Sequence, residues 1–251
     1  MMRRMVAAAV WLLAVSQAPA DPARLTVWAW ERPEDLRFLP QDVDIAVQSG
    51  FIVLSGDNLT ARSRRFPLLA RAEQVSTSVV HLQIDHRKPL NWTPQLRAQA
   101  AAAIVRLAQG VDVRRVQIDF EVRASERQIL RDVVTDVRAA LPPDTQLSMT
   151  ALASWCAHET WFEDLPINEI APMLFRMGPG GEQIRSELAR GGDFSSARCR
   201  SALAVSADAP ILRAPVGRRI YLFSPRSWTQ GDFERVVGRI SDWSAPITPP
   251  H

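Results

Sequence analysis

Two acidic side chains two residues apart, Asp119 and Glu121, are the strongest chemical signal in this sequence of 251 residues. They stand in the segment 115–121, where polar and apolar residues alternate as they do in a strand. Because side chains point alternately to the two faces of a strand, we expect both carboxylates on one face. A helix-forming run, 125–140, follows closely, so the acids should lie at the carboxyl end of a strand. Barrel and open α/β enzymes keep their catalytic groups at that end.

The remaining chain alternates between strand-like and helix-like segments, which is typical of an α/β fold. The strand-like segments are 25–30, 51–55, 79–85, 115–121, 146–154, 169–177, 202–206 and 219–224. The helix-like segments are 94–109, 125–140, 182–190 and 232–240, with weaker helical character in 33–44. Eight strands connected in this way predict a (β/α)8 TIM-type barrel in which the early helices are weak or missing.

The first twenty residues have the features of a secretory signal peptide. Two arginines precede an apolar run over 5–15, and Ala18 and Ala20 supply the small residues that a signal peptidase requires. We expect cleavage to leave one barrel domain, residues 21–251, in the periplasm or outside the cell. An uncleaved N-terminal anchor is the alternative; after cleavage no stable membrane anchor is expected.

The charge balance argues against a nucleic-acid partner. The whole chain has 30 basic and 27 acidic residues, a formal charge of +3. The signal segment contains two arginines and no acid, so the mature chain carries 28 minus 27, or +1. Its basic residues form no block of the kind that follows a phosphate backbone.

The two cysteines, Cys156 and Cys199, belong to a chain that is expected to be exported. In an oxidising compartment such a pair favours a disulfide, with two separate buried thiols as the alternative. Neither cysteine has enough further ligands at the right spacing for a zinc site, and no metal or cofactor is expected. The sequence lacks the glycine-rich loop of a phosphate-binding site. The glycine-containing segment 178–181 is instead expected to form a turn after the sixth strand. A Gly-x-Ser-x-Gly elbow is missing too, which argues against a serine hydrolase.

Several strands carry a polar face in addition to an apolar one. His81, Asp85, Asp119, Glu121 and Arg176 would lie on these polar faces and line the barrel interior. Unpaired polar groups are costly to bury, so a polar lining indicates a solvated site. The alternative is a closed structural ion-pair network. If the polar lining is a functional site, we expect Asp85 and Arg176 to converge with Asp119 and Glu121 in one pocket at the C-terminal end of the barrel.

Four tryptophans are candidates for sugar binding. Trp28 and Trp30 are at the first strand, Trp155 follows the fifth and Trp228 follows the last, so all are expected near the same rim. Flat rings on a rim are platforms for sugar faces; the alternative is that they fill the core. Arg176 is expected either to contact an anionic or acetylated group of the ligand or to form a salt bridge with Asp119.

The segment 118–121 (IDFE) resembles the end of the motif of chitinase-type glycoside hydrolases of family 18. In that motif an acidic residue, an aromatic spacer and a catalytic glutamate close the fourth barrel strand. The resemblance implies that Glu121 is the general acid and that Asp119 assists it, or steadies the acetamido nucleophile of an N-acetylated sugar. Two further aspartates of the motif are replaced here by Arg114 and Gln117. A non-catalytic glycan-binding barrel is therefore the alternative to an enzyme.

A second resemblance covers most of the mature chain. Five segments are similar to the bacterial family called domain of unknown function 3142: 28–30 (WAW), 117–120 (QIDF), 147–156 (LSMTALASWC), 172–178 (PMLFRMG) and 199–202 (CRSA). This family has no assigned activity, so the resemblance adds no chemistry. Our hypothesis from the sequence is an exported glycoside-hydrolase-like barrel that acts on, or binds, a polysaccharide.

Overall fold

The computed structural model describes residues 24–110, 113–210 and 217–241. The expected signal segment, residues 1–20, lies outside the described residues. Within the described ranges, no helix is both long enough and apolar enough to cross a membrane.

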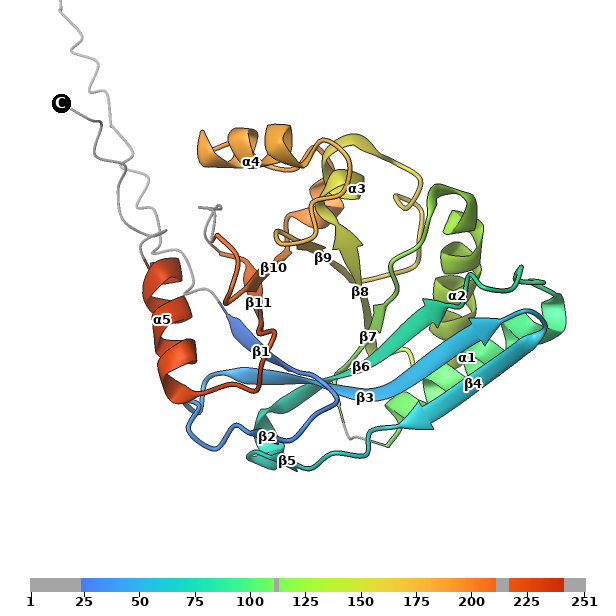
Figure 1. The fold of residues 1–251 in the computed structure, drawn as a ribbon, viewed down its shortest axis with the longest axis horizontal. Coiled ribbons are helices and arrows are strands. Elements are labelled where there is room, and N and C mark those ends of the chain that lie inside the picture. Colours follow the sequence, from blue (N-terminus) through green and yellow to red (C-terminus); the bar gives the residue numbers. More distant parts are fainter. Residues whose placement is uncertain (1–23, 111–112, 211–216, 242–251) are drawn as a thin grey trace, which may run out of the picture.

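Eight parallel strands form a closed ring, which confirms the TIM-type barrel (Figure 1). In order around the ring they are β1 (Leu25–Ala29), β3 (Asp44–Ser55), β6 (Val75–Ile84), β7 (Arg115–Asp119), β8 (Gln146–Leu152), β9 (Glu169–Met173), β10 (Ala202–Ser206) and β11 (Arg219–Phe223). Strand β1 pairs in parallel with both β3 and β11, and these two pairings close the ring. Each strand-like segment of the sequence contributes one barrel strand, although β3 begins seven residues earlier than expected, at Asp44.

The helices lie outside the ring (Figure 1). They are α1 (Pro94–Ala108) after β6, α2 (Arg127–Ala140) after β7, α3 (Ala153–His158) after β8, α4 (Gly181–Ala189) after β9 and α5 (Gln230–Ser241) after β11. Three 3₁₀ turns, Ala72–Gln74, Ala124–Glu126 and Ala197–Cys199, complete the helical elements of the described chain. The helix α1 begins where expected, because the Thr93 side chain accepts a hydrogen bond from the Leu96 backbone N–H at 3.2 Å.

The connections from β1 to β3 and from β3 to β6 contain short strands instead of α-helices. This agrees with the prediction that the early helices of the barrel are weak or missing. Strand β4 (Asn58–Ser63) forms an antiparallel hairpin with β3. Strands β2 (Glu34–Asp35) and β5 (Leu68–Leu69) form a separate small sheet. The prediction of helical character in 33–44 was wrong, since this range contains strand β2 and no helix. The backbone N–H groups of Glu34 and Leu36 bond to carbonyls in the segment that contains β5, and this tertiary pairing overrides a weak local preference.

The barrel interior is filled by side chains. Trp28, Tyr221 and Phe223 lie on β1 and β11, and small alanines of other strands face them. The β1 and β11 rings are close neighbours, since the centroids of Trp28 and Phe223 are 4.3 Å apart. A second, larger apolar core lies between the strands and the outer helices. The barrel interior is therefore a packed core.

Ion pairs occupy the end of the barrel at which the strands begin. Arg219 pairs with Asp44 at 3.0 Å and with Glu169 at 3.3 Å, and Arg115 pairs with Glu169 at 3.5 Å. The Tyr221 hydroxyl donates to Glu169 at 2.6 Å; burial first, and then the charge of Glu169, raise the pKa of Tyr221. These groups pair with one another, and charged groups at this end of a barrel serve stability.

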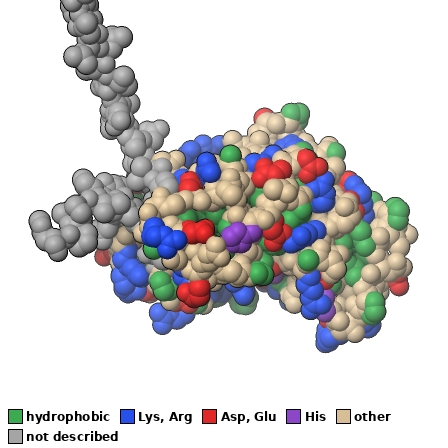
Figure 2. All heavy atoms as spheres, turned by 90° about the horizontal axis from the view of Figure 1, so that it is seen from above, with side chains coloured by type: hydrophobic (Ala, Val, Ile, Leu, Met, Phe, Trp, Pro, Cys, Tyr) green, Lys and Arg blue, Asp and Glu red, His purple; other side chains and the backbone are tan. Residues whose placement is uncertain are grey.

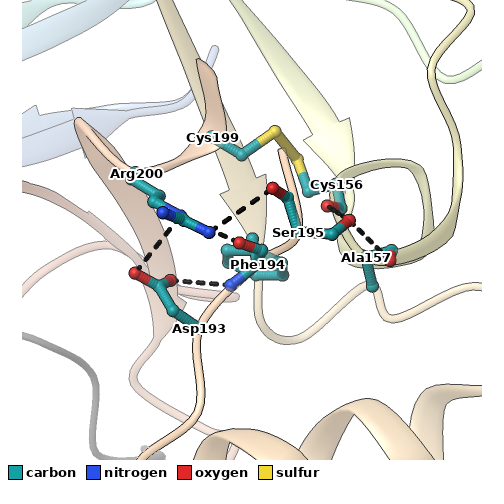
Figure 3. The surroundings of a disulfide bond; sticks show 7 residues. All are labelled: Cys156, Ala157, Asp193, Phe194, Ser195, Cys199 and Arg200. Atoms are coloured by element: carbon teal, nitrogen blue, oxygen red, sulfur yellow. Dashed lines mark hydrogen bonds and ion pairs between the residues drawn. A yellow bond between two sulfur atoms is a disulfide. The ribbon is translucent and has the colours of Figure 1, made fainter. Parts of the chain in front are cut away.

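A disulfide joins Cys156 in α3 to Cys199 before β10, which confirms the expected pairing (Figure 3). Both cysteines are fully buried and their Cα atoms are 5.8 Å apart. Nearby, the Ser195 hydroxyl donates to the carbonyl oxygen of Ala157 at 2.7 Å. The bridge therefore anchors the long connection between β9 and β10 to the outer side of the barrel.

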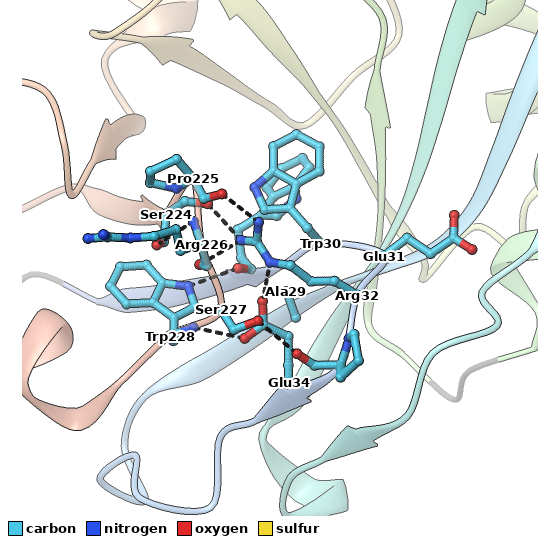
Figure 4. Close-up of polar contacts among 12 residues, drawn as sticks. Ala29, Trp30, Glu31, Arg32, Glu34, Ser224, Pro225, Arg226, Ser227 and Trp228 are labelled. Atoms are coloured by element: carbon cyan, nitrogen blue, oxygen red, sulfur yellow. Dashed lines mark hydrogen bonds and ion pairs between the residues drawn. The ribbon is translucent and has the colours of Figure 1, made fainter.

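A partly buried polar cluster connects the loops after the first and last barrel strands (Figure 4). The Arg32 guanidinium bonds to Glu34 at 2.8 Å and donates to the carbonyl oxygens of residues 224–226. The other carboxylate oxygen of Glu34 accepts the backbone N–H of Trp228 at 2.9 Å. These bonds hold the two ends of the domain together where β1 and β11 meet.

The surface carries charges of both signs. On the face shown in Figure 2, basic and acidic side chains are interspersed, and neither sign forms a broad patch. Over the described surface many charged side chains are paired, for example Arg97 with Asp132 at 2.9 Å and Arg131 with Asp164 at 2.6 Å.

Candidate active site

Asp119 is the last residue of β7 and lies at the C-terminal mouth of the barrel, only 5% exposed. Its Oδ1 accepts a hydrogen bond from the Thr150 hydroxyl on β8 at 2.7 Å. Its Oδ2 lies 2.6 Å from Nδ1 of His81 on β6. His81 and Asp119 are direct partners in the β6–β7 register, so both side chains emerge on the inner face at the same height. The carboxylate is thus held from both neighbouring strands.

Glu121 follows two residues later and reaches solvent, with 41% of its side chain exposed. Arg176, in the loop after β9, approaches it with Nε 3.3 Å from Oε1. Partial burial raises the pKa of Glu121, and the charge of Asp119 adds to this, while Arg176 and His81 oppose it. The net shift is upward, so this carboxyl keeps its proton to a higher pH than an ordinary glutamate, as a general acid requires.

A cleft of about 460 Å³ opens at the carboxyl ends of β1, β9, β10 and β11. Three aromatic residues, Trp30, Phe175 and Phe223, line it together with Arg176 and Asp208. The Phe223 ring centroid is 5.9 Å from that of Trp30 and 4.9 Å from that of Phe175. Since Arg176 contacts both the cleft and Glu121, the cleft adjoins the acidic pair.

A larger cavity, of about 750 Å³, opens near the opposite end of the barrel. Glu73, Arg114 and Asp144 line it, close to the start of β6, β7 and β8. Neither Asp119 nor Glu121 contributes to it. Size alone would favour this cavity, but the acid pair and the aromatic rings favour the smaller cleft, and catalytic groups of barrels gather at the C-terminal end.

Three of the four tryptophans expected on the rim are buried. Trp28 fills the barrel interior, Trp155 packs edge-on against Trp161 with ring centroids 5.0 Å apart, and Trp228 donates its indole N–H to the Trp28 carbonyl oxygen. Each of the three is at most 4% exposed. They therefore offer no ring face to a ligand, and only Trp30 among the four reaches the cleft.

Asp85 does not join the acidic pair. Its carboxylate accepts two side-chain hydrogen bonds from Arg87, at 2.8 Å each, and these bonds hold the pKa of Asp85 well below its usual range. Ser55 is a further, longer contact at 3.4 Å. No contact between Asp85 and Asp119 or Glu121 occurs among the described residues. Of the residues expected to converge, Asp119, Glu121 and Arg176 come together, and Arg176 pairs with Glu121 instead of Asp119.

Thr150 and Phe51 take part in the site although the sequence did not single them out, and His81, which was expected on the polar lining, proves to be a direct partner of Asp119. The Phe51 ring on β3 stacks on the His81 ring, with centroids 5.0 Å apart and planes 11° apart. The alternating pattern placed His81 on a polar strand face, but only the register of neighbouring strands shows that His81 and Thr150 both touch Asp119. Across the described residues, no group of three or more potential ligands is arranged to hold a metal ion.

A solved structure shares this architecture: a family GH18 chitinase from Chromobacterium violaceum, with a TM-score of 0.50. The two sequences are 14% identical, and the similarity covers 80% of this chain and 78% of the chitinase chain. At this identity the match shows the shared barrel fold. No family model matches the chain, and no curated protein does. The resemblance to the domain of unknown function 3142 family therefore stays a prediction.

Proposed function

We propose that this protein is an exported, glycoside-hydrolase-like barrel that cleaves a polysaccharide at the C-terminal mouth of the barrel. Glu121 acts as the general acid and Asp119 assists. The observation that carries the proposal is the state of Glu121: a half-exposed carboxyl with a raised pKa, beside a buried second acid and next to an open cleft. Such a group can protonate the oxygen of a glycosidic bond as that bond breaks.

The cleft has the composition that a sugar requires. Trp30, Phe175 and Phe223 supply apolar ring surfaces for the C–H faces of a sugar ring. Arg176 and Asp208 supply charged hydrogen-bonding groups along the same wall. The ligand we propose is a carbohydrate, with no metal or cofactor.

Export is part of the proposal. The disulfide between Cys156 and Cys199 is of a kind that persists in oxidising compartments. Together with the signal-like segment 1–20, it favours the periplasm or the extracellular medium.

A non-catalytic glycan-binding barrel is the second candidate. The ion pair between Glu121 and Arg176 favours the ionised form of Glu121, which opposes its use as an acid. Gln117 stands at one of the positions where the family 18 motif has an aspartate, and its buried amide has no hydrogen-bond partner. Both features are compatible with binding and reduce the resemblance to an active enzyme.

Hydrolysis of a panel of N-acetylated and deacetylated glycans tests the proposal and separates the two candidates. The Glu121→Gln variant should lose activity by about 10²- to 10⁴-fold while it still binds the glycan. The matched control is Glu182→Gln, which changes an exposed glutamate on α4, and it should retain full activity. Binding without hydrolysis by the wild-type protein would support the glycan-binding barrel. A wild-type protein that neither binds nor cleaves any glycan of the panel would refute both.

A further inference from the structure

We propose that His81 is a catalytic residue of this site: Asp119 orients its ring, and its Nε2 accepts the proton of the attacking water. The inference rests on the proposed function and specifies how the reaction proceeds. Asp119 then has a positioning role, and Glu121 and His81 form the acid and base of a single displacement.

The hydrogen bonds of Asp119 define the protonation pattern of His81. An ionised carboxylate can only accept hydrogen bonds, and Asp119 accepts one from Thr150 at Oδ1. The contact of 2.6 Å between Oδ2 and Nδ1 therefore places the imidazole proton on Nδ1. In the neutral ring this leaves the lone pair on Nε2, which forms no hydrogen bond with any described residue. A carboxylate that holds an imidazole in this tautomer is the arrangement by which enzymes prepare histidine as a base.

Aromatic packing fixes the His81 ring while part of it stays accessible. Phe51 stacks on the ring, and the Arg62 guanidinium lies 4.9 Å from the Phe51 centroid. The Trp30 ring meets the imidazole edge-on, with centroids 6.5 Å apart, and Trp30 itself lines the cleft. The His81 side chain keeps 26% of its surface exposed. The ring is therefore held in one orientation and can be reached from the mouth of the barrel.

The charged groups around His81 fit this assignment. Asp119 contacts the ring directly. A positive charge on His81 would lower the pKa of Glu121, so the acid role of Glu121 and the base role of His81 both require the neutral ring. Arg62, behind Phe51, is paired with Glu31, and Arg176 is paired with Glu121. The only direct ionic partner of the ring in the described structure is thus the carboxylate that orients it.

The reaction balances with these two groups and one water molecule. Glu121 transfers its proton to the leaving glycosidic oxygen as the bond from that oxygen to the anomeric carbon breaks. Water attacks the anomeric carbon from the opposite face and gives a proton to Nε2 of His81, while Nδ1–H remains bonded to Asp119. The histidine then returns its proton to solvent and Glu121 takes one up. Because the sugar is displaced once, the product has the inverted anomeric configuration.

The test uses a glycan that the wild-type protein hydrolyses. His81→Gln should lower kcat by about 10²- to 10⁴-fold and leave KM nearly unchanged, because the base acts only in the chemical step. Imidazole added to a His81→Ala variant should restore part of the activity, which it would not do if the side chain only supported the fold. His86→Gln is the matched control, because His86 is exposed, bonds to Glu126 and forms no contact with Asp119 or Glu121 in the described structure. NMR of the first product should show inversion.

Several results would overturn the inference. They are a retained anomeric configuration, a His81→Gln kcat within threefold of wild type, and a folded His81→Ala variant that imidazole does not rescue. If Glu121→Gln still abolished hydrolysis in those cases, the proposed function would stand and only the role of His81 would be wrong. If the wild-type protein hydrolysed no glycan, the role of His81 would fall with the proposed function.

Discussion

Removal of the disulfide is the perturbation whose effect on stability the structure defines best. The bridge joins residues 43 apart in sequence, Cys156 and Cys199. For a loop of this length, the loss of chain entropy in the unfolded state corresponds to about 4 kcal/mol at 25 °C. For a domain of this size that would lower Tm by roughly 8–16 °C. The double variant Cys156→Ala/Cys199→Ala should therefore remain folded at room temperature but unfold at a clearly lower urea concentration.

Alanine is the appropriate replacement because both cysteines are fully buried. A serine hydroxyl would be left without a partner there, and its desolvation would add a separate cost. The assay is urea unfolding followed by tryptophan fluorescence. Wild-type protein in a reducing agent is the control, since it loses the cross-link and keeps both sulfur atoms. Any difference between the reduced protein and the double variant then measures the packing of the sulfur atoms.

The chain-entropy argument would be refuted if both the reduced protein and the double variant lost less than about 1 kcal/mol. Such a result would mean that the segment 156–199 already has restricted freedom in the unfolded chain. A loss well above 4 kcal/mol in the double variant alone would point to the cavity left by the sulfur atoms instead.

Two further predictions follow from single contacts. The charge of Arg176 lowers the pKa of Glu121, so Arg176→Met should raise the pKa of Glu121 further. Because the general acid must be protonated, the alkaline limb of the pH–activity profile should then move to higher pH. A shift of that limb to lower pH would contradict the role of Glu121. Gly178 has φ = +71° and a Cβ there would collide with the Ser154 side chain, whereas Gly191, at φ = +84°, has open space around it. Gly191→Ala should cost about 1 kcal/mol from the backbone alone and Gly178→Ala clearly more, measured by thermal unfolding; equal losses would exclude the collision.

The sequence by itself predicted the barrel because the strands follow local rules. Each strand segment is a short apolar or alternating run bounded by turn residues, and hydrophobic periodicity depends only on neighbours in the chain. The helix α1 (Pro94–Ala108) was equally predictable, because Thr93 provides the N-cap and Gly110 ends the run. The alternation in 115–121 also placed Asp119 on the inner face correctly, since the side-chain period of a strand is two.

What the tertiary structure alone decided is which side chains meet. The contact between His81 and Asp119 joins residues 38 apart and depends on the β6–β7 register, for which the sequence carries no local signal. Arg176 pairs with Glu121 and not with Asp119, and this too depends on where the loop after β9 lies relative to the end of β7. Burial of Trp28 follows from closure of the ring, because only then do β1 and β11 place their rings in one interior. Periodicity assigns a side chain to a face, but packing between distant segments determines whether that face is a core or a site.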